Sequence, residues 1–412
     1  MFAAIAAGPS RLRHYSTSAD CAATLSCLEK LGLQVERNDC EVIIHGVGLN
    51  GFAAPDCELD CGNSGTTMRL LAGILAGQNF AATLTGDESL RSRPMQRIIE
   101  PLEMMGAEIS SNKGRAPLRI QGAHPLQAID YELLTASAQV KSCILLAGLH
   151  AEGKTTVVEN EITRDHTERM LEWFDANIET GKPEREPETV RFASITGPAQ
   201  LTARDISIPG DISSAAYFIA AAILLPQSSL EISDVGLNPT RTSFLDQLRL
   251  MEPAIEIRNQ RADCNERRGD ISVSGETSSI GHQTERITIN GALIPQLIDE
   301  LPLLAVVGSQ REGGIEIRDA KELRVKESDR IAATVAGLRA MGCEAEEFAD
   351  GLRVNGPTKL RGARIDSHGD HRIAMSFAVA GLVAEGETEI AGSDCVAVSF
   401  PEFFDLLESV GK

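Results

Sequence analysis

Six stretches of the chain repeat one pattern: an apolar helix rich in Gly, Ala and Leu, a turn of small residues, and a short strand. The stretches begin about 65 to 85 residues apart, which indicates internal duplication. They are residues 1–15, 65–86, 139–160, 213–235, 297–319 and 371–392. An amphipathic pattern follows each strand, with apolar residues at steps of three and four. Each repeat therefore predicts a strand, a buried helix, a strand, an amphipathic helix and a further strand.

The six repeats group as three plus three. The segment SIPGDISSAAY (207–217) is the predicted joint, because Pro209 and Gly210 break a strand and Asp211 or Ser213 can cap the next helix. A chain of 412 residues is long enough for two or three domains. We therefore expect an α/β fold with one domain over residues 1–208 and a second over 209–412.

The chain opens inside a repeat. MFAAIAAG has no strand or capping residue ahead of its helix, whereas the fourth repeat has the lead-in PGDISSAA. A secretory signal would need a basic region and a longer apolar run, and a mitochondrial presequence would need basic residues within the neutral positions 1–9. We expect the first repeat to lack its beginning.

Composition excludes several classes of protein. No apolar run reaches the roughly 20 residues of a membrane helix. The nine cysteines are scattered, and the one close pair, Cys57 and Cys61, has no second pair to complete a metal site, so a reduced, cytoplasmic setting is expected. A net charge of −20 disfavours a nucleic-acid partner but not small anions, since local fields can oppose the global charge.

One motif is misleading. GLHAEGKT (148–155) matches the phosphate-binding loop of nucleotide hydrolases, which follows a strand and opens a helix. Here the order is reversed, because the preceding KSCILLAGL is predicted helical and the following KTTVVEN is predicted to be a strand. We interpret the match as a helix-to-strand turn.

Polar and basic residues gather at the predicted helix starts. Free N–H groups there suit an anion, and a glycine lets the backbone approach it closely. Lys326 and Arg330 are four apart, which predicts that they lie on one helical face. Cations at helix starts are disfavoured by roughly 0.3–1 kcal/mol each, so their repetition indicates bound anions. The residues are Asn63, Ser64, Gly65, Thr66, Arg93, Arg164, Lys326, Arg330, His371 and Arg372.

Each of these residues also has a structural explanation. Arg93 could pair with Asp87, and Arg372 with Asp370. The Asp299-Glu300 pair could cap a helix, and His371 could be a packing residue. Six independent salt bridges explain the combined pattern less well than a shared anionic ligand does.

Seven ordered motifs resemble the 5-enolpyruvylshikimate-3-phosphate synthase family over the whole chain. They are GNSGTTMRLLAG, RPMQRIIEPL, QVKSCILLAGL, NPTRT, IPQLIDELPLLAV, LRVKESDRI and GDHRIAMSFAVAGL. The resemblance implies a two-domain inside-out α/β barrel, with three βαβαββ-like units per domain and ligands between the domains. This agrees with the three-plus-three repeat.

The resemblance implies transfer of the enolpyruvyl group of phosphoenolpyruvate to the 5-hydroxyl of shikimate 3-phosphate, with release of phosphate. It implies a monomer that uses no metal and no organic cofactor. The charge and the apolar runs described above predict no nucleic-acid partner and no membrane partner. The phosphoenolpyruvate-binding residues would be Asn63, Gly65, Thr66, Arg93, Gln139, Arg330 and Arg372. Those for shikimate 3-phosphate would be Ser137, Ala138, Gln139, Arg164, Asp299 and Lys326.

The resemblance also assigns catalytic roles. Asp299 would take the hydroxyl proton and Glu327 would protonate the methylene carbon, with Lys326 and His371 supporting the site. Opposed charges suit this chemistry, because the addition passes through a cationic carbon flanked by phosphate and carboxylate.

The chain departs from the family at its start. Relatives carry a strand and PGDKSISHR before the first helix, whose Lys-Ser pair and Arg touch the substrates, and this sequence lacks that segment. We expect an active synthase whose gene model starts too late. The alternatives are an impaired chain that only binds shikimate 3-phosphate, and the enzyme that enolpyruvylates UDP-N-acetylglucosamine. The second rival carries a cysteine before its Arg-Pro motif, which GDESLRSRP (86–94) lacks.

Overall fold

The protein is described here by a computed structural model covering residues 1–38, 41–183, 187, 190–251, 254–275 and 285–411. The chain divides into two compact units. The first unit comprises Met1–Ile208 and Asp263–Glu266, and the second comprises Pro209–Ala262 and Arg267–Lys412. Each unit has its own apolar core.

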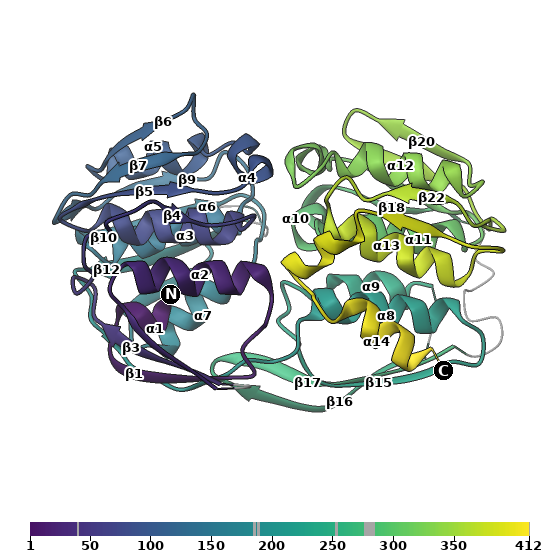
Figure 1. The fold of residues 1–412 in the computed structure, drawn as a ribbon, viewed down its shortest axis with the longest axis horizontal. Helices are drawn as coiled ribbons and strands as arrows, with labels where there is room; N and C mark the ends of the chain where they lie inside the picture. The colour runs from purple at the N-terminus through teal and green to yellow at the C-terminus, as the bar shows by residue number, and fades with distance from the viewer. Residues whose placement is uncertain (39–40, 184–186, 188–189, 252–253, 276–284, 412) are drawn as a thin grey trace. The chain divides into compact units, whose positions relative to one another are not determined.

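The first unit alternates helices and strands in the predicted order (purple to teal in Figure 1). Its helices are α1 (Phe2–Ile5), α2 (Ala19–Lys30), α3 (Gly65–Ala76), α4 (Glu88–Ser92), α5 (Gln96–Met104), α6 (Ala138–Gly148) and α7 (His166–Trp173). Its strands are β1 (Ala6–Arg13), β2 (Gln34–Asn38), β3 (Glu41–Val47), β4 (Leu59–Asp60), β5 (Ala81–Thr85), β6 (Glu108–Ser111), β7 (Leu118–Gln121), β8 (Leu126–Gln127), β9 (Asp130–Glu132), β10 (Ala151–Glu159), β11 (Ile178–Gly181), β12 (Arg191–Gly197), β13 (Leu201–Thr202) and β14 (Ile206–Ser207).

Each repeat of the first unit forms one mixed sheet. In the second repeat the strand order is β4-β5-β7-β6. Strands β4 and β5, which precede and follow α3 in the chain, are parallel, whereas β6 and β7 are antiparallel. The third repeat has the order β11-β12-β10-β8, with β9 also parallel to β10. In the first repeat β13 and β14 lie parallel to β1, in the place that the lead-in strand takes elsewhere. The sheets thus follow the predicted repeat.

The second unit continues the pattern (teal to yellow in Figure 1). Its helices are α8 (Ile212–Leu224), α9 (Ser243–Arg249), η1 (Gly291–Leu293), α10 (Ile294–Leu297), α11 (Leu301–Ser309), η2 (Lys321–Val325), α12 (Arg330–Ala340), α13 (His371–Leu382), η3 (Ser393–Val398) and α14 (Phe403–Val410). Its strands are β15 (Ser229–Gly236), β16 (Ala254–Asp263), β17 (Glu266–Ser274), β18 (Ile287–Ile289), β19 (Ile315–Ile317), β20 (Ala345–Phe348), β21 (Gly351–Val354), β22 (Arg364–Asp366) and β23 (Glu389–Ala391).

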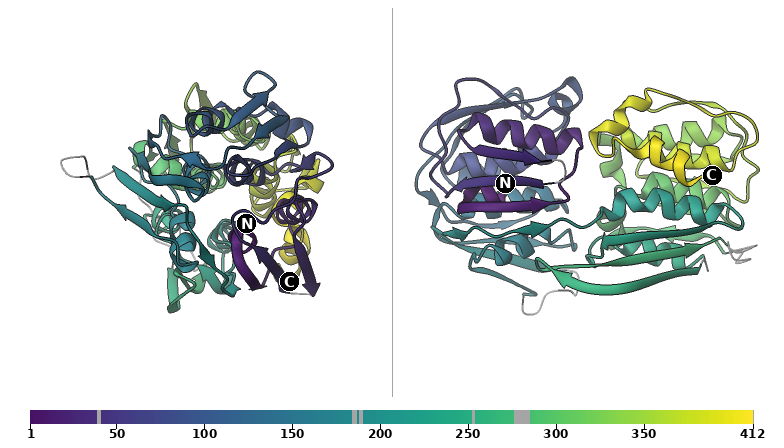
Figure 2. Two further views of the ribbon diagram at one scale, coloured as in Figure 1. Left: turned by 90° about the vertical axis from the view of Figure 1, so that its left-hand side faces the viewer. Right: turned by 60° about the horizontal axis from the view of Figure 1, so that its bottom comes forward.

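Helices form the interior of the second unit. Helices α8, α11 and α13 pack against one another, and most of their residues are buried. The sheet β15-β17-β16 lies outside them and is at the front of the right-hand view of Figure 2. The other sheets are β18-β19-β21-β20 and β22-β23. None of the sheets formed by the described residues closes into a barrel. The predicted α/β fold with buried first helices is confirmed.

Two local predictions need correction or confirmation. The first helix was expected to run through MFAAIAAG, but α1 ends at Ile5, because Ala6 already pairs with Leu201 and starts β1. The side chain of Met1 makes no capping hydrogen bond, whereas Asp211 caps α8 through Ser213 N and Ser214 N. The turn in GLHAEGKT follows α6 and precedes β10, which confirms that it is not a phosphate-binding loop.

Five glycines occupy equivalent places near the last strand of a repeat. Each lies so close to the carboxyl end of its buried helix that a Cβ atom would come within 3 Å of two or more backbone carbonyl oxygens. They are Gly46, Gly122, Gly197, Gly275 and Gly356. The missing side chain therefore lets strand and helix backbones approach in five of the six repeats.

Replacing Gly122 with alanine is expected to lower the free energy of unfolding by about 1–3 kcal/mol, as overpacking typically does. The new Cβ would meet the carbonyl oxygens of Leu75, Ala76 and Gln78, which the rigid end of α3 cannot move away. Urea unfolding followed by circular dichroism measures the change. Gly411→Ala, at an exposed position, is the control and is expected to stay within about 0.5 kcal/mol; equal effects would contradict the close-approach argument.

Among the described residues, no single helix combines the length and apolar character needed to cross a bilayer. The bent helix pair Gly291–Leu297 and Leu301–Ser309 is long and apolar enough only when the two helices are taken together. Every residue of α11, the second helix of this pair, is buried in the protein core.

Candidate active site

The start of α3 is built from the motif GNSGTTMR. Ser64 caps the helix by accepting a hydrogen bond from Thr67 N at 3.2 Å. Gly65 is the first helical residue, so the free N–H groups of the first turn stand beside a residue without a side chain. Among the described residues, a Cβ on Gly65 would lie 2.6 Å from Arg69 Nη1 and 3.4 Å from Arg93 Nη1. Two guanidinium groups therefore converge on the start of α3.

Arg93 lies between α4 and α5 and is almost fully buried. Its Nη2 donates to Asn63 Oδ1 at 2.5 Å, and Asn63 Nδ2 in turn donates to Asp87 Oδ2 at 2.7 Å. The sequence offered Asp87 as a direct partner for Arg93. The hydrogen bond to Asn63 instead connects the two residues that were predicted to bind the same ligand.

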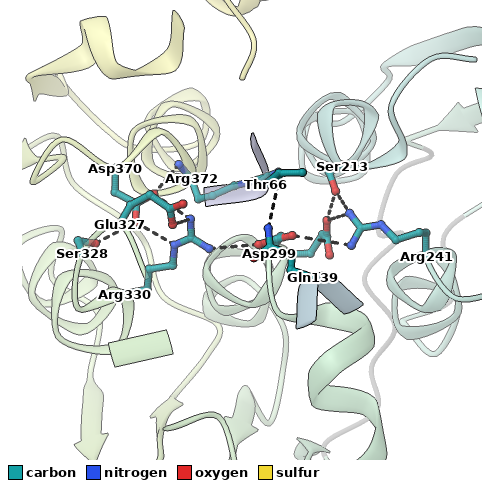
Figure 3. A network of polar contacts seen from close by, with 11 residues as sticks. Thr66, Gln139, Ser213, Arg241, Asp299, Glu327, Ser328, Arg330, Asp370 and Arg372 are labelled. Atoms are coloured by element: carbon teal, nitrogen blue, oxygen red, sulfur yellow. Dashed lines mark hydrogen bonds and ion pairs between the residues drawn. The ribbon is translucent and has the colours of Figure 1, made fainter. Parts of the chain in front are cut away.

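Gln139 joins α6 to the same place. Its Nε2 donates to Thr66 Oγ1 at 2.8 Å, and its Oε1 accepts from Arg69 Nη1 at 2.7 Å; Figure 3 draws the first of these bonds. The predicted residues Asn63, Gly65, Thr66, Arg93 and Gln139 thus lie together. Arg69 was not predicted, although its position one helical turn after Gly65 was a usable signal.

The remaining predicted residues of the first unit lie at the starts of α6 and α7. Ser137 caps α6 and Ala138 is its first residue. Arg164 lies two residues before α7, in the loop that follows β10. The two helices are fastened together by the ion pair between Lys141 and Glu168. This ion pair links the segment that carries Arg164 to the segment that carries Ser137.

In the second unit the predicted residues surround Arg330, whose side chain is 1% exposed. Its Nε donates to Asp370 Oδ2 at 2.8 Å, its Nη1 donates to Asp299 Oδ1 at 3.3 Å, and its Nη2 donates to Glu327 Oε2 (Figure 3). These carboxylates raise the pKa of Arg330, although burial opposes its charge. One buried cation therefore brings both predicted proton-transfer carboxylates together.

Asp370 connects this cluster to α13. The fully buried carboxylate accepts hydrogen bonds from Ser328 Oγ, from the Arg330 side chain and from Arg372 N. The sequence suggested a side-chain pair between Asp370 and Arg372. The structure pairs Asp370 with Arg330 instead, and Asp370 caps the helix that begins with His371.

The side chain of Arg372 interacts electrostatically with a tyrosine and three other carboxylates. Burial opposes its charge, but Tyr217, Asp299, Glu300 and Asp211 together raise its pKa well above the ordinary value. The guanidinium of Arg372 is therefore a cation in the site.

The prediction that Lys326 and Arg330 share a helical face is wrong. Helix η2 ends at Val325, and α12 begins at Arg330 because Asp329 accepts a hydrogen bond from Ala332 N and caps it there. Lys326 and Glu327 therefore lie in the connection between two helices. Burial lowers the pKa of Lys326, while Asp299 opposes that shift.

A second buried group lies beside Asp299. Arg241, from the motif NPTRT, pairs with Glu300 at 3.1 Å and with Asp299 at 3.8 Å, and it donates to Ser213 Oγ. Neither Ser213 nor Glu300 was predicted to have more than a capping role. The motif pointed to Arg241, but nothing local in the sequence indicated its partners.

His371 is neutral at physiological pH. Burial, with Arg372 and Arg330 nearby, lowers its pKa to about 4. His150, which lies between α6 and β10 in the first unit, is also buried and has its pKa lowered to about 4. His371 can therefore accept or donate a hydrogen bond in the site without adding a cation.

These two histidines are expected to make stability fall as the pH drops. A folded-state pKa of about 4 against 6.5 when unfolded means that the unfolded chain binds more protons below pH 6.5. The contribution of each histidine to the free energy of unfolding is fully present above about pH 6.5 and is lost as the pH falls toward about 4. Between pH 7.5 and 5 the loss is about 2 kcal/mol per histidine.

Urea unfolding at both pH values measures this loss. His150→Leu is expected to remove about 2 kcal/mol of it, whereas His14→Asn, at an exposed position, is expected to leave it unchanged. A His150→Leu protein with the same pH dependence as the parent would contradict the assignment.

Among the described residues, no group of three or more His, Cys, Asp or Glu side chains is arranged to hold a metal ion. The site residues around Gly65 and those around Arg330 are instead two clusters of charged side chains. The first unit presents guanidiniums at a helix start, and the second presents two acids held by buried arginines. The first arrangement suits phosphate or carboxylate, and the second suits proton transfer.

Comparison with known proteins agrees with this chemistry. The sequence model of the family described as EPSP synthase (3-phosphoshikimate 1-carboxyvinyltransferase) matches residues 1–407. The chain is 51% identical over 411 residues to the 3-phosphoshikimate 1-carboxyvinyltransferase of Koribacter versatilis, covering 100% of this chain and 92% of the relative. It is 45% identical over 415 residues to the enzyme of the same name from Bacillus subtilis, covering 100% and 94%.

Solved structures show the same fold. EPSP synthase from Acinetobacter baumannii superposes with a TM-score of 0.84 at 41% identity, covering 100% of this chain and 92% of that one. The enolpyruvyl transferase NikO from Streptomyces tendae, at 18% identity, superposes with a TM-score of 0.75 over 100% and 91% of the two chains, which is a likeness of fold. The protein belongs to the EPSP synthase family.

Proposed function

We propose that the protein transfers the enolpyruvyl group of phosphoenolpyruvate to the 5-hydroxyl of shikimate 3-phosphate and releases phosphate. The observation that carries the proposal is the Arg330 cluster, in which one buried guanidinium holds Asp299 and Glu327 at the same place. The reaction needs one group that accepts the hydroxyl proton and another that gives a proton to the methylene carbon. Membership of the family supplies the substrates.

In the proposed addition step, Asp299 accepts the proton of the 5-hydroxyl as its oxygen bonds to C2 of phosphoenolpyruvate. Glu327 gives a proton to C3, so the double bond becomes a methyl group. In the elimination step the C2–O bond to phosphate breaks and C3 returns its proton to Glu327, which restores the double bond. The departing phosphate takes up the proton held by Asp299, so both acids regain their starting states. Arg330 and Arg372 stabilise the carboxylate and phosphate during both steps.

The polyanionic substrates explain the cations of the first unit. We assign Asn63, Gly65, Thr66, Arg93 and Gln139 to phosphoenolpyruvate, because Arg69 and Arg93 converge on Gly65. The start of α6 and the loop before α7 are assigned to shikimate 3-phosphate. These residues are Ser137, Ala138, Gln139 and Arg164, with Asp299 and Lys326 in the second unit.

A phosphate-release assay tests the proposal. Phosphate is expected to appear only when both phosphoenolpyruvate and shikimate 3-phosphate are present, with the enolpyruvyl product identified by ¹H and ³¹P NMR. UDP-N-acetylglucosamine in place of shikimate 3-phosphate is expected to give none. Protein that is folded by circular dichroism but releases no phosphate from the first pair would overturn the proposal.

We propose further that residues 1–208 and 209–412 are the two catalytic domains, and that the enzyme acts in the cytoplasm as a monomer. Light scattering coupled to gel filtration is expected to give the mass of one chain. A dimer mass would contradict the monomer.

A further inference from the structure

Ser213, Arg241 and Glu300 form a buried polar cluster in the second unit that has no role in the proposed reaction. Their exposed fractions are 1%, 6% and 3%. Glu300 Oε1 accepts hydrogen bonds from both Ser213 Oγ and Arg241 Nη2, and Arg241 Nη2 also donates to Ser213 Oγ. One edge of the Arg241 guanidinium is therefore hydrogen-bonded to Ser213 and Glu300, which are also hydrogen-bonded to each other.

The other edge of Arg241 faces Asp299. Its Nη1 lies 3.8 Å from Asp299 Oδ2 and makes no hydrogen bond with any described residue. The opposite carboxylate oxygen, Oδ1, accepts from Arg330 Nη1 at 3.3 Å. Each oxygen of Asp299 thus faces a different guanidinium (Figure 3).

We infer that Arg241 is a positioning residue for Asp299, and that the Ser213–Arg241–Glu300 cluster fixes the direction in which that carboxylate points. This inference rests on the proposed function, in which Asp299 accepts the hydroxyl proton. A base works only within hydrogen-bond reach of the proton it takes, and a misplacement of about 1 Å can cost about 10²-fold in rate. Arg241 faces the carboxylate oxygen that Arg330 does not contact, so the two guanidiniums together restrict rotation of the carboxylate.

Other charged groups also face Asp299. Lys326 and Arg372 interact with it electrostatically, Glu300 is its neighbour in sequence, and Glu327 lies across Arg330. Arg330 is shared among three carboxylates. Arg241 differs from Arg330 because its second carboxylate, Glu300, holds it in place and is not a predicted reacting group.

Arg241→Gln tests the inference by two independent readouts. The pKa of Asp299, followed by ¹³C NMR of labelled aspartate and assigned with Asp299→Asn, is expected to rise by about 1–3 units when one of the cations that face it is lost. In steady-state kinetics kcat is expected to fall about 10- to 100-fold, with KM for shikimate 3-phosphate changed less than about twofold. The acid limb of the kcat profile is expected to move up with the measured pKa, and Arg241→Lys is expected to restore part of kcat.

Arg249→Gln is the matched control, because Arg249 is exposed on α9 and pairs with Asp246 at 2.9 Å. It is expected to change neither readout. If Arg241→Gln does not fold, Arg241→Gln/Glu300→Gln removes the carboxylate left unpaired, and the pKa of Asp299 is then compared with that in Glu300→Gln.

An unchanged pKa of Asp299 in the folded variant would overturn the inference, and so would an unchanged kcat. A parent protein that turns over neither substrate would refute the proposed function alone. The titration of Asp299 would still decide whether Arg241 holds it.

Discussion

Arg330→Met is expected to lower kcat/KM by about 10²- to 10⁴-fold, because it removes charge-assisted hydrogen bonds worth about 1.5–3 kcal/mol each from the reacting carboxylates and from the bound anion. Stability is expected to fall as well, by about 3–5 kcal/mol. The side chain of Arg330 is 1% exposed, and its loss would remove the buried cation that pairs with Asp370, Glu327 and Asp299.

Phosphate-release kinetics and urea unfolding measure the two effects separately. Arg339→Met is the control, since Arg339 is an exposed residue on the same helix that donates to the carbonyl of Ala345. Arg330→Lys keeps the charge but cannot reach three carboxylates at once, so its losses are expected to lie between those of the parent and the methionine variant. A folded Arg330→Met protein with parental kcat/KM would show that Arg330 has no part in the reaction.

Lys141→Met is expected to lower the free energy of unfolding by about 3–5 kcal/mol, the typical cost of removing one partner from a buried ion pair. Lys141 Nζ lies 3.0 Å from Glu159 Oε1 and 2.7 Å from Glu168 Oε1, and all three side chains are buried. Burial raises the pKa of Glu168, and Lys141 opposes that shift. The substitution would leave the carboxylates of Glu159 and Glu168 buried in the first unit without the cation that pairs with both of them.

Urea unfolding of Lys141→Met measures this cost. Lys154→Met is the matched control, because Lys154 pairs with Glu179 at 2.6 Å on the surface, where such pairs contribute about 0–1 kcal/mol. Lys141→Met/Glu159→Gln/Glu168→Gln is expected to recover most of the loss, since it removes the stranded charges. Equal stability changes in the two lysine variants would refute the assignment.

Lys141 also has a consequence for function. It fastens α6, which begins after Ser137, to α7, which begins just after Arg164. Weaker binding of shikimate 3-phosphate is therefore expected in Lys141→Met even under conditions where the variant remains folded, and calorimetric titration measures it.

The repeat pattern could be predicted because it is local. Apolar periodicity specifies which helices are buried, and Ser64, Ser137, Asp211 and Asp370 are residue types that cap helices, as they do here. Asn63, Gly65 and Thr66 could be predicted for the same reason, since a helix start offers free N–H groups whatever surrounds it.

The error at Lys326 has a local cause that the sequence shows only in retrospect. The spacing of four suggested a shared helical face, but Asp329 caps α12 and interrupts the helix before Arg330. Capping by Asp competes with helical continuation, because its side chain bonds the backbone directly.

The sequence by itself determined the repeats, the helix starts and the identity of the residues that carry charge, since these follow from interactions between near neighbours. Only the tertiary structure decided which charges meet. Ser213, Arg241 and Glu300 come from segments 28 to 87 residues apart. Asp370 pairs with Arg330, 40 residues away, whereas the sequence suggested Arg372 as its partner. Such pairs form because a buried charge must find its opposite wherever packing places it, and packing is a property of the whole unit.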